Sequence, residues 1–576
     1  MNVSDYTAKF LADKKIKHVF GITGGTIVYL FDSLARTPNI EYICTHHEQA
    51  AAIAADAYAR VSGNMGVAIT TSGPGATNLL TGVCCAYFDS IPALFITGQV
   101  SSSLLRKDDG VRQSGFQETD VPKIYSSVTK YVSIIDKAEK IRYELEKAVC
   151  IAKHKRPGPV MLDLPEDIQL KNVDSEKLEG YTIPHSERKK GLEQIADQTM
   201  QLIDSAKKPV VIIGAGARLR GLEREIVSFV EKLSIPVALT WGALDILPYN
   251  HPLSVRDFGI TAGRTGNYAV QNADLILALG TRLDTHQIGN NPSSFAPEAK
   301  KIIVDIDEKE LAKHSERGMK GIELLVNADL GEFLDLVSEK LGSVKKDIGE
   351  WRNHLDNLKK EYPSCPASCY SSKKEINPYA FIDTLSEQAE EGDIIIPEAG
   401  CNVTWSMQSW KVKPGQRVFS SFNHSPMGYG LPASIGASFA SNKGRVIAIV
   451  GDGGLMMNEH EMATISHHNL PVKIFVLNNQ GYGMIKQTQK ARVWERYEAC
   501  SKKHFHLPEP IELARAHGIK QSERIDSHSE LRQKIKKVLA YREPVLCDVR
   551  IHPDSIILRK VLSGKTLDQI PLDDEN

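Results

Sequence analysis

The chain has 576 residues, with 70 Lys plus Arg against 71 Asp plus Glu, and 42% of its residues are hydrophobic. This length predicts two to four domains, and the balanced charge gives no reason to expect nucleic acid or an anionic membrane as a partner. No apolar run is long enough to cross a bilayer, and the first ten residues lack the apolar core of a secretion signal. Nine cysteines in so long a chain do not make a disulfide scaffold, so we expect a reduced, cytoplasmic location.

Residues 1–172 alternate strand-like and helix-like patterns and are expected to form one α/β domain. Ser4 is expected to cap a first helix, and Glu48 to begin a longer one that runs to Val61. Short apolar runs followed by Gly, Ser or Thr predict the strands of a doubly wound parallel sheet. These runs are His18–Phe20, Ile40–Cys44, Val67–Thr70, Ala93–Thr97 and Pro159–Leu164.

Two similar blocks follow, so the predicted fold class is α/β with three doubly wound parallel-sheet domains. The second block spans residues 190–342, and the third spans residues 375–556. Charged and polar segments at 171–190 and 344–374 are expected to be linkers, and 557–576 is expected to be a mobile lid or a frayed end. The predicted strands of these blocks are Pro209–Gly214, Ala273–Gly280, Lys301–Asp307, Asp393–Ile396, Arg445–Val450, Val472–Leu477 and Val545–Ile551.

The stretch from Gly451 to Asn479 carries the most specific signal for a binding site. Two apolar strands end there, one in Gly-Asp-Gly-Gly and the other in Asn-Asn. Glycines let the backbone approach a phosphate, while Asp452 and Asn479 offer oxygen ligands that suit Mg²⁺. An ordinary glycine turn followed by a helix, with Asn458 and Glu461 as a capping pair, is the alternative interpretation.

This pattern resembles the diphosphate signature of thiamine-diphosphate enzymes. The segments His47–Arg60 and Ser72–Asn78 resemble the pyrimidine-binding domain of acetolactate synthases, and the resemblance extends over residues 3–555. It implies a pyrimidine-binding, a central and a diphosphate-binding domain in that order, with thiamine diphosphate and Mg²⁺ as cofactors. The metal ligands that it implies are Asp452, Asn479 and the carbonyl of Gly481.

The resemblance also implies roles for residues outside the diphosphate signature. Glu48 would contact N1′ of the aminopyrimidine and help to turn the thiazolium C2 into a carbon nucleophile. From the residues alone, a first-turn glutamate that complements the helix dipole explains Glu48 about equally well. Met427, directly before Gly-Tyr-Gly, would prop the cofactor in a bent shape, although an isolated Met is more often a core filler. Gln117, Phe116 and Gly25 match substrate-side positions.

Further cofactor contacts are implied for Gly73, Asn78, Gly451, Gly453, Gly454 and Met484. In the central block, Gly214 to Gly216 together with Leu279–Asp284 and Val304–Asp307 resembles a flavin-binding domain. The family commonly shows Asp-Asp-Arg where this chain has Asp-Thr-His at 284–286. Bound FAD and an empty central domain therefore both remain open.

The resulting hypothesis is a thiamine-diphosphate-dependent transferase, an acetolactate synthase-like carboligase that decarboxylates a 2-oxoacid, with pyruvate as donor. Two-carbon transfer to a larger ketone such as a nucleotide-linked keto sugar, simple decarboxylation and a non-catalytic homologue are the alternatives. Thr23 replaces a proline of the family, and Thr488 replaces a tryptophan of its acceptor pocket. Trp405–Met407 is aligned with the Gly-Gln-His of the diphosphate loop. The family's architecture implies at least a homodimer, or a dimer of dimers.

Overall fold

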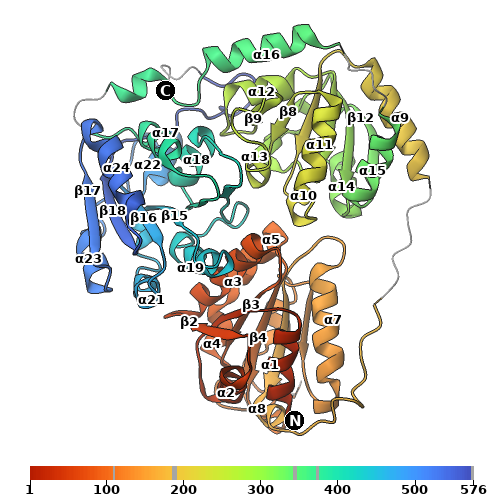
Figure 1. Ribbon diagram of the computed structural model, residues 1–576, viewed down its shortest axis with the longest axis vertical. Helices are drawn as coiled ribbons and strands as arrows, with labels where there is room; N and C mark the ends of the chain where they lie inside the picture. Colours follow the sequence, from red (N-terminus) through yellow and green to blue (C-terminus); the bar gives the residue numbers. More distant parts are fainter. Residues whose placement is uncertain (108–109, 184–190, 342–346, 372–374, 572–576) are drawn as a thin grey trace.

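The computed structural model describes residues 1–107, 110–183, 191–341, 347–371 and 375–571, and it contains three six-stranded parallel sheets with flanking helices (Figure 1). The predicted fold class is confirmed. The central strands of each sheet are short, apolar and buried on both faces, as expected for parallel strands covered by helices, whereas edge strands such as Gln521–Ile525 are partly exposed. No helix in the described ranges is long and apolar enough to span a membrane.

The first sheet has the strand order β2-β1-β3-β4-β6-β5. Its strands are β1 (His18–Gly21), β2 (Glu41–Cys44), β3 (Gly66–Thr70), β4 (Ala93–Gln99), β5 (Tyr131–Ile134) and β6 (Val160–Pro165). The helices around it are α1 (Val3–Asp13), α2 (Val28–Arg36), α3 (Glu48–Ser62), α4 (Pro74–Asn78), α5 (Leu80–Asp89), α6 (Val121–Tyr125), α7 (Ile141–Lys153) and α8 (Glu166–Gln169). The expected cap of the first helix is wrong, because Asn2 and not Ser4 accepts the N–H of Asp5, at 2.7 Å.

The second sheet has the order β12-β11-β10-β7-β8-β9. Its strands are β7 (Pro209–Ile213), β8 (Val237–Leu239), β9 (Ser254–Asp257), β10 (Leu275–Leu279), β11 (Lys300–Asp305) and β12 (Ile322–Asn327). The helices of this domain are α9 (Leu192–Ser205), α10 (Gly216–Leu219), α11 (Glu223–Leu233), α12 (Arg264–Gln271), α13 (Thr285–Ile288), α14 (Glu308–Glu316) and α15 (Leu330–Lys340).

The third sheet has the order β14-β13-β15-β16-β18-β17, the same as that of the first sheet when each is numbered from its own start. Its strands are β13 (Ile394–Pro397), β14 (Arg417–Val418), β15 (Val446–Gly451), β16 (Val472–Asn478), β17 (Gln521–Ile525) and β18 (Val545–Arg550). The helices are α17 (Pro378–Gln388), α18 (Cys401–Ser409), α19 (Gly430–Ala440), α20 (Asp452–Leu455), α21 (Glu461–His467), α22 (Gly483–Arg492), α23 (Pro510–Ala516) and α24 (Leu531–Ala540).

These strand orders fix where ligands can bind, because crevices form where the connections of a parallel sheet reverse direction. The reversal lies between β1 and β3 in the first sheet, between β7 and β10 in the second, and between β13 and β15 in the third. The Gly-Asp-Gly-Gly segment leaves β15, so the third crevice coincides with the predicted diphosphate site.

Two segments that were expected to be irregular are ordered. The second linker contains α16 (Gly349–Glu361), whose Trp351 is buried and donates its indole N–H to the carbonyl of Pro209. The C-terminal segment packs on the central domain, where Val561 N–H donates to Ile260 O at 2.8 Å and Ile570 is buried. A frayed end is therefore wrong for the tail up to residue 571, and the linker residues 184–190, 344–346 and 372–374 lie outside the described residues.

The first and third domains are joined through α3 and α19 (Figure 1). A Cβ on Gly436 would overlap the carbonyl oxygen of Ala54, so only glycine allows these helices to pack this closely. At the same contact Arg60 forms ion pairs with Asp56 and Asp89, both at 2.8 Å. Helix α3, whose first residue is Glu48, is thereby packed against the third domain along its middle.

Candidate functional site

Glu48 lies at the first position of α3, where the loop after β2 ends. The side chain of His47 caps the helix by accepting the N–H of Gln49 at 3.1 Å. Glu48 Oε2 accepts a hydrogen bond from Asn78 Nδ2 at 2.9 Å, and a Cβ on Gly75 would lie 3.6 Å from Glu48 Oε1. The structure thus brings Glu48 and Asn78 together, on a half-buried carboxylate whose other oxygen has no hydrogen-bond partner in the described part of the chain.

Gly73 and Gln117 form the second part of this edge. Gly73 has a φ of +58°, and a Cβ there would lie 2.8 Å from the Cβ of Gln117. Gln117 itself has a φ of +63°, a conformation that L residues adopt rarely and that occurs often at functional loops. Gly25 is exposed at the start of the helical turn that follows β1, and Phe116 is 85% exposed. The substrate-side residues are therefore gathered on one open edge of the first domain.

Asp452 is the first residue of α20, directly after β15, and it is buried. Its Oδ1 accepts the N–H of Gly453 at 2.8 Å, and its Oδ2 accepts the N–H of Gly481 at 3.2 Å. Burial raises the pKa of the Asp452 carboxyl to about 7, because few groups in the site solvate its charge. A bound cation would favour the ionised form, so this site fits a metal ion.

Asn479 and Gly481 lie beside Asp452 at the end of β16. Asn479 is 8% exposed, and a Cβ on Gly483 would lie 2.7 Å from its Nδ2. The donor set is one carboxylate, one amide and one main-chain carbonyl, which leaves positions for the diphosphate and water around Mg²⁺. The described residues contain no group of three acidic, His or Cys side chains that could hold a metal ion, in agreement with so sparse a donor set.

The glycines of the third domain also fit a phosphate group. A Cβ on Gly451 would lie 2.9 Å from Asn402 Nδ2, and one on Gly453 would overlap the ring of Tyr482. Asn402 belongs to α18, which begins directly after β13, and so the loop Glu398–Asn402 forms the other wall of the crevice. The alignment of Trp405–Met407 with the diphosphate loop is therefore wrong, because these residues are buried in the middle of α18.

Met427 lies at the mouth of this crevice, before the turn that leads into α19. Its side chain is 37% exposed, so the core-filler interpretation does not hold within this chain. Gly428 has a φ of +84°, and its carbonyl accepts Asn458 Nδ2 at 2.8 Å. Residues 479–482, which we call the metal-site loop, lead into α22. Met484 is half-buried on the first turn of that helix.

Glu398 is a site residue that sequence reasoning missed. It is fully buried at the end of β13, and it accepts the N–H of Gly428. Burial raises its pKa to about 7, while the backbone N–H groups of the turn at 428–430 act in the opposite direction. Its only sequence signal is an acidic residue after a short apolar strand.

Glu461 was also missed in its actual role. It does not form a capping pair with Asn458, whose side chain donates to Gly428 instead. Glu461 Oε1 accepts the backbone N–H groups of His46 and His47 at 2.8 and 3.2 Å, directly before Glu48. Burial raises the pKa of Glu461 to about 7. The third domain therefore positions the loop that carries Glu48 in the same chain.

The two groups of site residues remain separate within one chain. Among the described residues, no hydrogen bond or ion pair joins Glu48 to Asp452 or Asn479. Each group occupies the open end of its own sheet. The hydrogen bonds of this chain therefore do not bring the two groups together into one site.

The central domain was the third candidate, as a flavin site at the crevice between β7 and β10. The N–H of Gly216 donates to Gly280 O at 2.9 Å, and a Cβ on Gly216 would lie 2.8 Å from that oxygen. A Cβ on Gly242, after β8, would lie 2.9 Å from the Cβ of Ala215. The glycines therefore serve the packing of three loops on one another, and the amide of Gly216 is already used.

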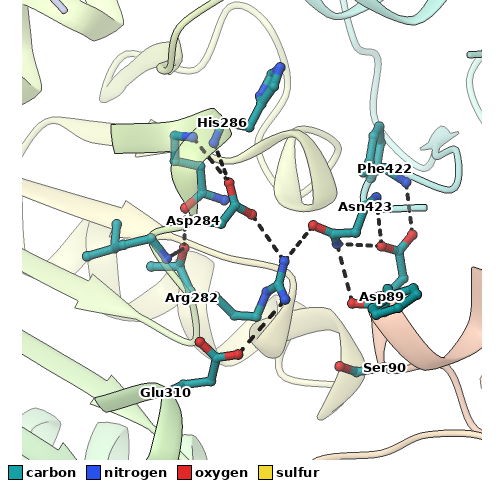
Figure 2. Close-up of polar contacts among 12 residues, drawn as sticks. Asp89, Ser90, Arg282, Asp284, His286, Glu310, Phe422 and Asn423 are labelled. Atoms are coloured by element: carbon teal, nitrogen blue, oxygen red, sulfur yellow. Dashed lines mark hydrogen bonds and ion pairs between the residues drawn. The ribbon is translucent and has the colours of Figure 1, made fainter. Parts of the chain in front are cut away.

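The polar groups of this crevice are engaged as well (Figure 2). Arg282 donates to Asp284 at 3.2 Å and to Asn423 at 2.5 Å, and Asn423 N–H donates to Asp89 at 3.1 Å. The rings of Trp241 and His286 lie 4.3 Å apart, centre to centre. The described residues do not fit a flavin dinucleotide. They connect the central domain to the third domain and, through Asn423, to the first.

Comparison with known proteins agrees with this division. Family models of the thiamine pyrophosphate enzymes match the chain at residues 1–124 (N-terminal TPP binding domain), 196–336 (central domain) and 398–549 (C-terminal TPP binding domain). The chain is 35% identical to the probable acetolactate synthase large subunit of Methanococcus aeolicus, over 97% of this chain and 93% of that one. It is 34% identical to the corresponding protein of Methanocaldococcus jannaschii (96% and 92% covered) and to chloroplastic acetolactate synthase 1 of Zea mays (97% and 86%).

Proposed function

Because the chain belongs to the thiamine-diphosphate-dependent enzymes and is a carboligase of the acetolactate synthase type, we propose that it decarboxylates pyruvate and joins the two-carbon unit to a second small 2-oxoacid. The observation that carries this proposal is the likeness to acetolactate synthase large subunits over 97% of the chain, together with Glu48, Asp452 and Asn479 at the ends of their strands. The proposal includes Mg²⁺ and no flavin.

Thiamine diphosphate, when bound, supplies a carbon nucleophile and an electron sink for decarboxylation. The role of Glu48 is to share a proton with the aminopyrimidine. One of its oxygens is held by Asn78, while the other is free to meet a ligand. The amide of Asn78 and the anchored backbone before Glu48 fix the carboxylate, and a fixed acid loses little entropy when it transfers a proton.

Asp452, Asn479 and the carbonyl of Gly481 would hold the metal ion. Two features support this assignment: Asp452 is buried, and burial raises its pKa by more than the backbone N–H groups around it lower it. Gly451 and Asn402 would face the diphosphate from the two walls of the crevice. Met427, at the mouth of the same crevice, would contact the bound cofactor.

The proposal requires a second copy of the chain, as a homodimer or a dimer of dimers. Several apolar side chains around the mouth of the third-domain crevice are exposed, among them Met427 (37%), Met457 (46%) and Ile485 (44%). Helix α22 contains no buried residue. Exposed apolar groups gathered beside a binding crevice mark an interaction surface. The edge of the first domain that carries Glu48, from a second subunit, would cover this surface and complete the site.

The substrate would lie between the two edges, with Gln117 and Gly25 on the side of the first domain. Thr488 is half-buried on α22, and its hydroxyl donates to Met484 O at 2.9 Å. A threonine in place of a tryptophan widens the acceptor side of this space. A second pyruvate or another small 2-oxoacid fits the carboligase chemistry without further groups.

The test is incubation of the purified protein with pyruvate, thiamine diphosphate and Mg²⁺, with carbon dioxide and the organic product measured together. We expect carbon dioxide release coupled to an acetohydroxy acid, and we expect both to be lost in Glu48→Gln. Glu139→Gln, an exposed glutamate of the same domain, is the control. Release of free acetaldehyde alone would indicate simple decarboxylation, and no release from pyruvate with any acceptor would overturn the proposed donor.

A further inference from the structure

A cavity of about 230 Å³ lies away from both groups of site residues, where the central domain meets the segment 361–368 and the C-terminal tail. It is bounded by the end of β9, the first turn of α12 and Arg559. We propose that this cavity binds a small phosphate-bearing anion, such as a phosphomonoester, and that Arg256 is the residue that holds it.

Three guanidinium groups line the cavity, from Arg256, Arg264 and Arg559. The facing acids are Asp257, which is buried, and Glu361, which is exposed at the rim. A guanidinium presents several N–H groups in one plane and binds phosphate oxygens in pairs, so a cluster of three in one cavity favours a phosphate over a single carboxylate.

Two of these arginines already have partners in the chain. Arg264 donates to Pro571 O at 2.6 Å and lies over the ring of Tyr362. Arg559 donates to Ser364 O at 2.8 Å and to Pro363 O at 3.1 Å. These contacts fix both side chains at the cavity wall, where they add positive charge without having to move.

Arg256 differs from the other two. Its guanidinium makes no hydrogen bond or ion pair with any described residue. It stacks on the face of Tyr249, with its central carbon 3.8 Å from the ring centre. Burial lowers its pKa, and the nearby groups of Tyr249, Asp257 and Asp383 offset this effect only in part. Stacking on a tyrosine is favourable but leaves all the donors unused.

The backbone of Arg256 is also unusual. Its φ is +70°, and it lies where the register of β9 against β8 shifts between Val237 and Ala238. A left-handed conformation is strained at a residue other than glycine. The bulge places this residue, with its strained backbone and its only partly compensated charge, at the cavity wall, and an anionic ligand accounts for both features.

Asp257 does not block this assignment. Its carboxylate is used within the chain, where it accepts Trp241 Nε1 at 3.3 Å and Gly263 N–H at 3.4 Å. Burial raises its pKa, which reduces the repulsion of an anion. Thr265 and Gly266, in the first turn of α12, present the positive end of an eight-residue helix to the same cavity.

The cavity is connected to the metal-site loop through the tail. Gln408 Nε2 donates to Arg559 O at 2.8 Å and to Thr261 O at 2.8 Å. Two residues before Arg559, Ile557 exchanges two hydrogen bonds of 3.0 Å with Gln487 on α22. A ligand in the cavity would therefore hold the tail in place and restrict α22.

The test uses the full-length protein loaded with thiamine diphosphate and Mg²⁺, so that the diphosphate site is filled. Inorganic phosphate and glycerol 3-phosphate are titrated by calorimetry at an ionic strength that chloride keeps constant. We expect saturable binding, weakened about tenfold or more in Arg256→Gln, since a charged hydrogen bond contributes about 1.5 to 3 kcal/mol. Arg532→Gln, an arginine whose side chain is 72% exposed, is the matched control and should bind like the unchanged protein.

Arg256→Gly keeps the proposal falsifiable if the first variant folds poorly, because glycine adopts a φ of +70° without strain. This variant should be at least as heat-stable as the parent in chloride and should lose the phosphate-dependent stabilisation. Binding should also slow amide hydrogen exchange in residues 557–571. No saturable heat with either probe, or an affinity of both Arg256 variants equal to that of the unchanged protein, would overturn the proposal. Binding of inorganic phosphate without glycerol 3-phosphate would overturn the phosphomonoester as ligand.

Discussion

The hydroxyl of Tyr429 donates to Asp56 Oδ2 at 2.6 Å and so joins the turn that follows Met427 to the helix that begins with Glu48. Both residues are buried, and Asp56 also accepts from Arg60. Burial raises the pKa of Asp56, although the ion pair acts against this shift. The two edges that carry chemistry are therefore connected through one carboxylate.

Substitutions at this contact are expected to distinguish the contribution of the Tyr429 hydroxyl to stability from that of the Asp56 carboxylate. Tyr429→Phe should destabilise the protein by about 1 to 2 kcal/mol, because it removes one buried hydrogen bond to a charged group. Asp56→Ala should cost about 3 to 5 kcal/mol, because it leaves Arg60 with fewer partners in a buried site. Urea unfolding of both single variants and the double variant measures the coupling. Additive effects would show that the hydroxyl and the carboxylate act independently.

Glu48→Gln tests the proton-sharing role without changing the size of the side chain. Glutamine can still accept the hydrogen bond from Asn78, so folding and cofactor binding should remain. The exchange of the cofactor's C2 proton with deuterated water, followed by nuclear magnetic resonance, should slow by about 10² to 10⁴. An exchange rate equal to that of Glu139→Gln would remove Glu48 from the mechanism.

The affinity for Mg²⁺ should depend on pH through Asp452. Because the pKa of this carboxyl is raised to about 7, the metal must displace a proton at lower pH. Binding should therefore weaken as the pH falls below 7, by up to about tenfold per pH unit. Asp452→Asn should bind Mg²⁺ and diphosphate more weakly and without this dependence, as measured by calorimetry at several pH values. A wild-type affinity that is constant between pH 5.5 and 8, roughly one unit or more on each side of the raised pKa, would contradict the assignment.

Glu461 is expected to make the protein less stable as the pH rises, whereas an ion-paired acid makes a protein more stable as the pH rises. Its pKa in the folded chain is raised from 4.5 to about 7, so the native state holds a proton that the unfolded state has released between these values. The stabilising contribution is present below pH 4.5 and is lost as the pH rises through 7, at up to about 1.4 kcal/mol per pH unit. In Glu461→Gln, urea unfolding without cofactor should show a flatter dependence. If stability depended on pH in the same way in the unchanged protein and in Glu461→Gln, Glu461 would not hold the proton assigned to it.

The purified protein should be colourless. The amide of Gly216 and the side chain of Arg282 are engaged within the protein, so the central crevice offers a flavin neither a phosphate cradle nor a free arginine. Visible absorbance after denaturation and removal of the protein is the measurement. Flavin released in an amount equal to the protein would show that these loops open. Glu48→Gln should give the same spectrum as the unchanged protein.

The strand-end residues were accessible from the sequence because their signal is local. A buried apolar strand followed by Gly-Asp-Gly or Asn-Asn places these side chains at one edge of a sheet, and Asp452 and Gly481 indeed meet there. Glu48 at the first position of α3 follows from the same kind of pattern. The fold class and the long central strands were predictable for the same reason.

The rest depends on contacts between distant parts of the chain. Glu461 caps backbone groups 415 and 414 residues earlier, and no local pattern distinguishes such a glutamate from one that begins a helix. Strands β8 and β14 have only three and two residues, too few to show a period. The glycines of the central domain indicated a ligand, whereas they are needed for the close approach of loops. The domain boundaries from the sequence stay a prediction.

The tail that follows β18 has a practical consequence for protein engineering. Although it is last in the chain, it lies on the central domain, where Arg264 binds the carbonyl of Pro571 and Asn272 binds Asp568. A chimera that exchanges residues 191–341 alone would combine the central domain of a relative with the C-terminal tail of this chain. Recombination between relatives should therefore transfer this terminal segment together with the domain that it covers, even though more than 200 residues of sequence separate the two.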